Sequence, residues 1–204
     1  AINYNANANE DDGSCEYPED VVFQPENREE LKTAVDEWIT DKEDASSIYG
    51  DINTWDTSLI TDMSLLFADK PTFNDDISDW DVSSVTNMDS MFIDADSFNQ
   101  DLSGWDVSSV TTMFGMFLGA ESFNGNISTW DVSSVTEWYG MSGMFANADS
   151  FNQDISSWDV SSVIDMYYMF YNTDDLSDDN KCAIHTSFSS NGNWPYDWEE
   201  YCSD

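Results

Sequence analysis

The chain has 204 residues, and its 42 acidic residues against 5 basic residues give a formal net charge of -37 at pH 7. A surface this negative repels phosphate backbones and anionic lipid headgroups, which excludes nucleic acid as a partner and argues against direct membrane insertion. Because 40% of the residues are hydrophobic and 15% are aromatic, the chain is nevertheless expected to fold.

The first segment, residues 1–20, is rich in Asp and contains a single cysteine, Cys15. Asp11 and Asp12 begin an oxygen-rich turn, and carboxylate oxygen is the ligand that Ca²⁺ prefers. We therefore treat both as candidate calcium ligands. The turn is shorter than a complete EF-hand loop, which spreads its ligands over about twelve residues, so a solvated acidic turn is the alternative.

Residues 21–50 are predicted to form an N-terminal helical cap. Within them, the stretch from Glu26 to Thr40 places apolar side chains at helical spacing. These side chains belong to Leu31, Val35, Trp38 and Ile39. A stack of repeats needs such a cap, because the open face of its first unit is otherwise exposed to water.

Residues 51–175 consist of a repeat of about five units. Trp-Asp dipeptides begin at Trp55, Trp80, Trp105, Trp130 and Trp158. Their spacing is 25, 25, 25 and 28 residues, a period typical of proteins whose units stack on one another. The unit reads approximately F-N-x-D-I-S-x-W-D-V-S-S-V-T-x-M-x-x-M-F-x-x-A-x-S. The fourth unit carries three extra residues around Trp138 to Ser142, where we expect a local bulge.

The pattern of apolar residues in each unit predicts one short strand followed by one short helix. Ile77, Trp80 and Val82 show the L-x-x-L-x-L spacing of a strand in a leucine-rich repeat. Apolar residues then recur at intervals of three and four residues, which favours an amphipathic helix. These residues are Val85, Met88, Met91, Phe92 and Ala95. The predicted fold class is an α/β repeat: a leucine-rich-repeat-like solenoid with short parallel strands on one face, short helices on the other, and a cap at each end.

Residues 176–204 are predicted to form a C-terminal cap. Cys182 and Cys202 bracket this last stretch, so a disulfide between them is the first expectation, and Cys15 is left to pair outside the segment. The tail and the last repeat unit are rich in aromatic rings, for which we weigh packing within the cap against contact with sugar or protein. The rings are Tyr167, Tyr168, Tyr171, Trp194, Tyr196, Trp198 and Tyr201.

The repeat units resemble the BspA-type leucine-rich repeats of bacterial, protist and algal surface proteins, most clearly in DISDWDVSSVTNMDSMF and DISSWDVSSVIDMYYMF. The flanks FQPENREELKTAVDEWI and LSDDNKCAIHTSFSSNGNWPYDW are also similar to flanking segments of that family. This resemblance covers nearly the whole chain and implies an extracellular protein with adhesion or ligand-binding roles and no catalytic residues. The opening NYNANANEDDGSCEYP resembles part of a thrombospondin type-3 module, in which a second cysteine precedes the Asn-Tyr-Asn. That resemblance implies that the partner of Cys15 lies outside this segment.

Two rows of acidic residues recur with the repeat and are candidate sites for Ca²⁺ or a basic partner. The Trp-Asp row contains Asp56, Asp81, Asp106, Asp131 and Asp159. The second row contains Asp76, Asp101, Asn126 and Asp154, with Asn74, Asn99, Asn124 and Asn152 two residues earlier. The alternative for both rows is that the side chains bond loop backbone between coils, as turn residues often do. Asn126 also begins an N-glycosylation sequon.

We interpret the chain as part of a secreted, cell-surface binding or adhesion module that is not an enzyme. It is expected to associate with cations such as Ca²⁺ and to engage an extracellular protein, a glycan or copies of itself. The alternative is a structural subunit of an extracellular filament, sheath or surface layer, because stacked repeats can join end to end. A third alternative, a hydrolase, has no particular carboxylate pair in its favour, and His185 is the sole histidine.

Overall fold

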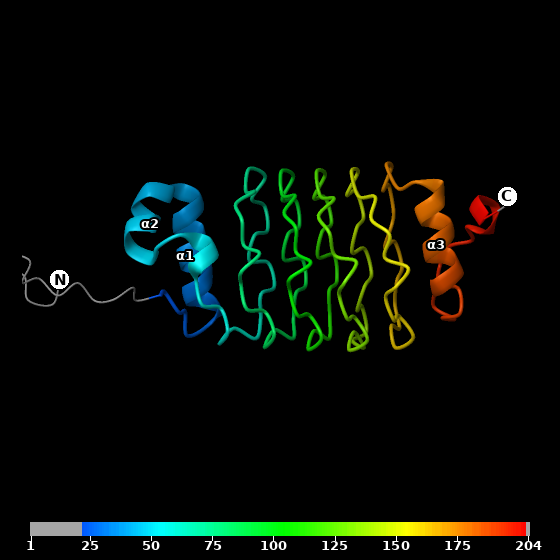
Figure 1. Cartoon of the computed structure of the whole chain (residues 1–204), viewed down its shortest axis with the longest axis horizontal. Coiled ribbons are helices and arrows are strands. Elements are labelled where there is room, and N and C mark those ends of the chain that lie inside the picture. The colour runs from blue at the N-terminus through cyan, green and yellow to red at the C-terminus, as the bar shows by residue number, and fades with distance from the viewer. Residues whose placement is uncertain (1–21, 203–204) are drawn as a thin grey trace, which may run out of the picture.

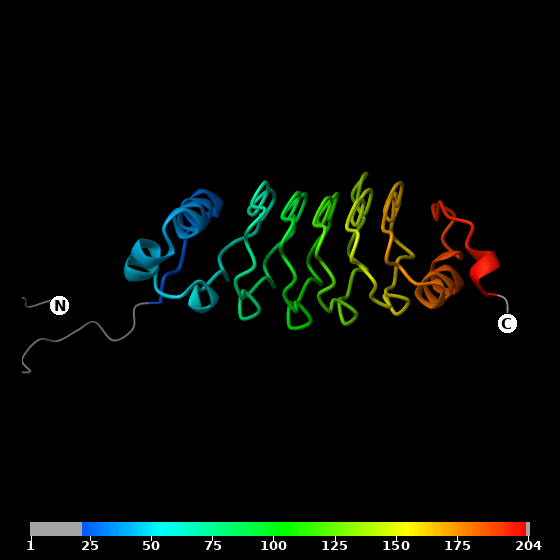
Figure 2. The ribbon, with the colours of Figure 1, turned by 90° about the horizontal axis from the view of Figure 1, so that it is seen from above.

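The computed structural model describes residues 22–202, which form an elongated stack of coils with helices at both ends (Figure 1). The elements in chain order are α1 (Arg28–Thr40), α2 (Lys42–Tyr49), the 3-10 helix η1 (Ile52–Thr54), α3 (Asp178–Phe188) and the 3-10 helix η2 (Glu199–Cys202). Seen from above, the coils between α2 and α3 stand side by side (Figure 2).

The predicted α/β leucine-rich-repeat fold is wrong. Within residues 22–202 there is no β-strand, and parallel pairing is limited to isolated bridges from Asn87 to Asp62 and to Thr112. The α-helices all lie outside the part of the chain between residues 50 and 177, so the predicted helices of the repeat units are absent as well. The repeat units are coils built from turns, and they form neither a sheet on one face nor a helical layer on the other.

Tight turns replace the predicted strand from Ile77 to Val82. The Trp80 N–H donates to the carbonyl of Ile77 at 3.2 Å, and the Val85 N–H donates to that of Val82 at 2.9 Å. The Trp80 indole Nε1–H donates to the carbonyl of Ile52 in the preceding coil at 2.7 Å. The same bond joins Trp105 to Ile77, Trp130 to Leu102 and Trp158 to Ile127. Indole groups therefore connect successive coils where paired strands were expected.

Runs of turns also replace the predicted helices. We call these runs the turn segments, and they cover residues 63–69, 88–94, 113–119, 141–147 and 166–172. In each of them the third and seventh residues have φ angles between 53° and 73°. These residues are Leu65, Asp69, Ser90, Asp94, Gly115, Gly119, Gly143, Asn147, Tyr168 and Asn172. Two left-handed residues in seven are incompatible with a right-handed helix, in which φ stays near -63°.

The turn segments satisfy their backbone by alternating bonds within and between coils. In the first pair of coils, the N–H groups of Met63, Leu65, Phe67 and Asp69 donate to the carbonyls of Asn87, Asp89, Met91 and Ile93 at 2.8–3.0 Å. The intervening N–H groups of Leu66 and Ala68 donate to carbonyls three residues earlier in their own coil. This pattern repeats up to the last turn segment, so buried backbone groups are paired without a strand or a helix.

Stacked aromatic rings fill the core of the coils. One row of rings, with neighbouring centroids 5.2–5.8 Å apart, contains Phe67, Phe92, Phe117, Phe145 and Phe170. A second row, with spacings of 5.9–6.2 Å, contains Phe73, Phe98, Phe123 and Phe151. The repeat tryptophans form a third row and are only 2–4% exposed. Each fully buried side chain contributes about 1.5–3 kcal/mol, so these rows stabilise the stack substantially.

Helix α1 covers the first coil. Its N-cap is Asn27, whose side chain accepts a hydrogen bond from the Glu30 N–H at 3.1 Å. The apolar stripe of the helix ends in Trp38, which packs edge-on against Trp55 with centroids 5.8 Å apart. The Trp38 Nε1–H donates to Asp75 at 2.8 Å, so α1 is joined to the stack by both packing and a hydrogen bond.

The C-terminal tail covers the last coil. The N–H of Phe170 has no following coil to bond, and it donates instead to the hydroxyl of Tyr196 at 2.8 Å. Trp194 and Trp198 pack on the Phe170 ring with centroids 6.2 and 5.4 Å away. Trp194, Tyr196 and Trp198 therefore pack within the cap, which is one of the two roles predicted for the tail aromatics, the other being contact with sugar or protein.

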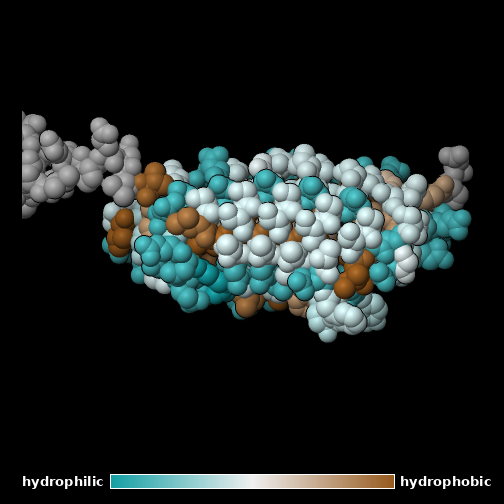
Figure 3. Space-filling model, turned by 90° about the horizontal axis from the view of Figure 1, so that it is seen from below, coloured by the Kyte–Doolittle hydropathy of each residue, from teal (hydrophilic) through white to brown (hydrophobic). Residues whose placement is uncertain are grey.

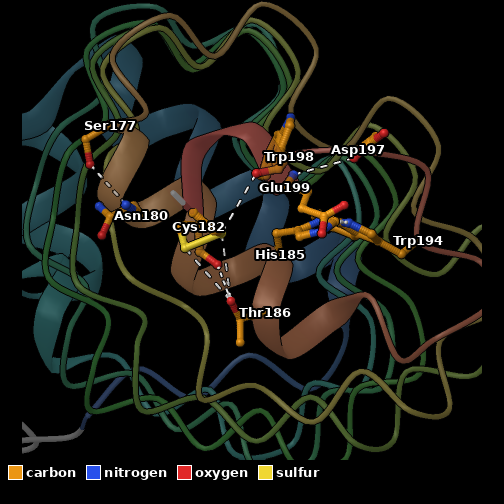
Figure 4. Close-up of a disulfide and its surroundings, with 10 residues drawn as sticks. Ser177, Asn180, Cys182, His185, Thr186, Trp194, Asp197, Trp198 and Glu199 are labelled. Carbon is orange, nitrogen blue, oxygen red and sulfur yellow. Dashed lines mark hydrogen bonds between the residues drawn. A yellow bond between two sulfur atoms is a disulfide. The ribbon is translucent and has the colours of Figure 1, made fainter. Parts of the chain in front are cut away.

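A disulfide between Cys182 and Cys202 ties α3 to η2, which is the pairing expected from the sequence (Figure 4). The Cα atoms of the two cysteines are 4.9 Å apart. On the same helix, His185 Nδ1 accepts a hydrogen bond from the Trp194 indole at 3.1 Å. The sole histidine of the chain therefore holds the tail against α3.

Candidate functional site

Each carboxylate of the Trp-Asp row holds a turn in its own coil. The N–H groups of Ser58, Ser83, Ser108, Ser133 and Ser161 donate to Oδ1 of Asp56, Asp81, Asp106, Asp131 and Asp159 at 3.0–3.1 Å. The hydroxyl groups of Ser83, Ser108 and Ser133 also donate to these oxygens at 2.6 Å. The structure thus gives the row a local structural role, because one oxygen of each carboxylate is already bonded.

These bonds lower the pKa of four carboxylates of the row, those of Asp56, Asp106, Asp131 and Asp159. The hydroxyl and N–H of Ser133 lower the pKa of Asp131, whereas the charges of Asp159 and Asp106 act in the opposite direction. The pKa of Asp106 is likewise lowered by Ser108 and opposed by the charge of Asp81. In these four carboxylates, hydrogen bonds to the charged form outweigh burial and repulsion and therefore favour the negative charge.

The second row and its Asn neighbours also bond backbone. The N–H groups of Ser78, Ser103, Ser128 and Ser156 donate to Asp76, Asp101, Asn126 and Asp154 at 2.9–3.1 Å. The N–H groups of Asn99, Asn124, Asn152 and Ser177 donate to the side-chain oxygens of Asn74, Asn99, Asn124 and Asn152 at 2.8–3.0 Å. The Asn side chains therefore link one coil to the next. Glycosylation of Asn126 stays a prediction.

The predicted calcium ligands within residues 22–202 are not gathered into clusters of three or more. Between residues 22 and 202, no group of three or more His, Cys, Asp or Glu side chains is close enough to hold a metal ion. Asp11, Asp12 and Cys15 lie outside the described residues. Calcium binding by the predicted residues stays a prediction.

An acidic groove that the sequence did not indicate runs along the seventh positions of the turn segments. It has a volume of about 580 Å³ and is lined by Asp94, Asp96, Gly119, Glu121, Asn147, Asp149, Asn172 and Asp174. Burial, followed by the charges of Asp69 and Asp96, raises the pKa of Asp94. The signal in the sequence was the recurrence of Asp, Asn or Gly at one register position.

A second groove combines aromatic rings with carboxylates, and we call it the aromatic groove. It has a volume of about 360 Å³ and is lined by Asn87, Asp89, Thr111, Thr112, Phe114, Glu137, Trp138 and Tyr139. Phe114 comes from the third turn segment, and Trp138 and Tyr139 come from the three-residue insertion of the fourth unit. Sequence reasoning predicted a bulge here but did not identify a site.

The insertion folds as a turn that places its two rings in solvent. The Gly140 N–H donates to the carbonyl of Glu137 at 3.0 Å, so Trp138 and Tyr139 are the two central residues of this turn. They are 71% and 57% exposed. A Cβ on Gly140 would lie 2.8 Å from Val135, which explains the glycine. In Figure 2 the yellow-green coil near residue 140 reaches beyond its neighbours.

The rings of the aromatic groove are inclined to one another. The Phe114 and Tyr139 centroids are 5.9 Å apart with the ring planes at 58°. Trp138 and Tyr139 are 6.4 Å apart and perpendicular. Asp89 Oδ1 accepts hydrogen bonds from the Thr112 hydroxyl at 2.5 Å and the Phe114 N–H at 2.9 Å, which fixes this carboxylate at the edge of the groove.

The next coil carries a cluster of exposed tyrosines. Tyr167 and Tyr168 lie 4.0 Å apart between centroids, and Tyr168 and Tyr171 lie 5.3 Å apart. The Ser142 hydroxyl donates to the carbonyl of Tyr167, so the two coils are directly joined. Unlike the tail aromatics, these three tyrosines are more than half exposed.

The structure and these grooves define an acidic repeat protein made of stacked coils. The chain belongs to the family described as "Mycoplasma protein of unknown function, DUF285", which matches residues 33–141 and 126–191. Membership in this family is consistent with a repeat protein of the general BspA type. It does not bear on the specific repeat motif or on the Cys-containing module. No curated protein and no solved structure matches the chain. Of the helices described between residues 22 and 202, none has the length and apolar character needed to cross a bilayer.

Proposed function

We propose that this chain is an extracellular, cell-surface binding module that attaches to its partner through the aromatic groove and catalyses no reaction. One observation carries the proposal: the insertion places Trp138 and Tyr139 in solvent, beside the exposed ring of Phe114. Exposed aromatic rings of this kind are enriched in interfaces and contribute strongly to binding. The stack does not need them, because its other units close without an insertion.

One long face of the molecule has no continuous apolar surface (Figure 3), which favours a specific contact over a general apolar one. In Figure 3, which shows one long face of the molecule, brown residues are scattered among white and teal ones and form no continuous patch. The family to which the chain belongs is compatible with surface proteins, which supports the proposed cell-surface location. The proposal includes cations that screen the acidic rows, with Ca²⁺ as the candidate.

The covered ends of the stack favour this proposal over a structural filament subunit. Helix α1 covers the first coil through Trp38, and the tail covers the last coil through Tyr196. Coils that are already covered offer no open face for end-to-end stacking. Sizing of the purified chain in Ca²⁺-containing buffer is expected to give a monomer, and a ladder of polymers would favour the filament.

A binding panel with matched variants tests the proposed function. The purified chain is presented to immobilised glycans and to short basic, acidic and neutral peptides. Saturable binding is expected to at least one of these classes, and the double variant Trp138→Ala/Tyr139→Ala is expected to lose about tenfold in affinity or more. Ile164→Ala, which truncates an exposed apolar side chain outside the groove, is the matched control. Absence of saturable binding throughout, or an unaffected double variant, would contradict the proposal.

A further inference from the structure

The acidic coils have no positive counter-charge of their own. The chain has 5 basic residues, and none lies between Lys70 and Lys181. The five basic residues form these ion pairs: Arg28 with Glu29 and Asp62, Lys32 with Asp36, Lys42 with Asp75, Lys70 with Asp36, and Lys181 with Asp178. All five are therefore engaged near the ends of the stack. No basic side chain between residues 22 and 202 is therefore left to pair with the carboxylates of the aromatic groove.

The inclined rings favour a cationic side chain over a flat sugar ring. The ring planes meet at 58° for Phe114 and Tyr139 and at 90° for Trp138 and Tyr139, so the rings do not form one flat platform across which a sugar could stack. Inclined faces surround a small volume from several sides. The negative face of an aromatic ring attracts an ammonium or guanidinium group that lies within about 6 Å of its centroid.

Two carboxylates complete the same groove. Asp89 is oriented by its bonds to Thr112 and Phe114, and Glu137 precedes the two inserted rings. Neither carboxylate has a basic partner among residues 22–202, since all ion pairs of the five basic residues lie elsewhere. A guanidinium group stacks on aromatic faces and also accepts a carboxylate in a two-point contact, so arginine matches this combination better than lysine.

We infer that the aromatic groove receives the cationic side chain of a basic segment in a partner protein, held between its three rings and its two carboxylates. This inference rests on the proposed function and adds the chemical class of the partner. Charge complementarity selects the occupant: a net charge of -37 attracts basic chains from a distance, and the groove then binds one side chain in place.

The probe for this inference is a short peptide of alternating glycine and arginine, titrated into the whole chain at about 150 mM salt to screen non-specific attraction. Trp138→Ala/Tyr139→Ala is expected to weaken binding about tenfold, whereas Trp138→Phe keeps a ring and should retain most of the affinity. Both positions are exposed at a turn, and an unchanged circular dichroism spectrum verifies folding.

A charge-matched pair separates the groove from general electrostatics. Glu137→Gln and Asp149→Asn each remove one negative charge, but only Glu137 lines the aromatic groove, and Asp149 lines the acidic groove. Glu137→Gln is expected to weaken peptide binding several-fold and Asp149→Asn by less than about twofold. Equal effects of the two, or a double ring variant that binds the peptide like the wild type, would overturn the inference.

The failure of this inference differs from the failure of the proposed function. Glycan binding that depends on Trp138 and Tyr139, without peptide binding, would leave the binding module intact and refute the cationic partner. A lysine peptide that binds more tightly than the arginine peptide would refute the two-point contact with guanidinium. Loss of every binding class would remove both proposals.

Discussion

Replacing Tyr196 by Phe should uncap the last coil without disturbing its packing. The substitution deletes only the hydroxyl that accepts the Phe170 N–H at 2.8 Å. The ring contacts with Trp194 and Trp198, at centroid distances of 5.1 and 4.7 Å, are retained. A buried donor left without an acceptor costs about 1–3 kcal/mol, so the free energy of unfolding should fall by an amount in this range.

Urea denaturation measures this loss, and hydrogen exchange localises it. The Phe170 amide should exchange faster in the variant, whereas Tyr201→Phe, which removes another tyrosine hydroxyl of the tail, is the control. Burial raises the pKa of Tyr196 to about 12. Because the unfolded chain loses this proton near pH 10, the stability that the neutral Tyr196 side chain contributes is complete below pH 10 and is lost as the pH rises toward 12. The variant should lack that part of the alkaline decline. Equal losses for both substitutions, with unchanged exchange at Phe170, would refute the role of this hydroxyl.

Two further changes test the links between and within coils. Gly125→Ala should lower the free energy of unfolding by about 2 kcal/mol or more, because its Cβ would lie 2.0 Å from the carbonyl oxygen of Gln100 in the preceding coil. Thermal denaturation measures this loss. An unchanged midpoint would contradict the close approach of the two coils. Ser133→Ala should raise the pKa of Asp131 by removing the hydroxyl bond that lowers it. An NMR titration of that carboxylate should therefore show protonation at higher pH than in the wild type, and a shift to lower pH would contradict the assignment.

The sequence predicts the core of this protein well, because burial depends on period more than on local conformation. The 25-residue spacing places each Trp and Phe on its counterpart in the next coil, and such rows are buried whatever backbone connects them. The periodicity of Leu31, Val35 and Trp38 likewise indicates the helix that the structure shows as α1. Core residues and the position of that helix therefore follow from pattern alone.

The same pattern gave the wrong secondary structure, because apolar spacings of three and four fit both a helix and a run of turns. The distinguishing signal was the seventh position of each turn segment, where Asp69, Asp94, Gly119, Asn147 and Asn172 stand. Asp, Asn and Gly are the residues that most readily adopt a positive φ. The third position holds Leu in one segment and Tyr in another, so it gives no such signal. Tertiary hydrogen bonds between coils decide the conformation there.

The candidate site could be predicted only in part. Repeated polar residues suggest a binding site, but the sequence does not show the hydrogen bonds that these side chains form within the stack. Asp81, Asp106 and Asp131 recur in register since each holds a turn, so their repetition has a structural cause. Side chains that the stack does not require are found where one unit departs from the others. Trp138 and Tyr139 are such a departure: the coils before and after close without them, and both remain in solvent. In a chain of near-identical units, a surface that distinguishes one partner from another must come from the unit that differs.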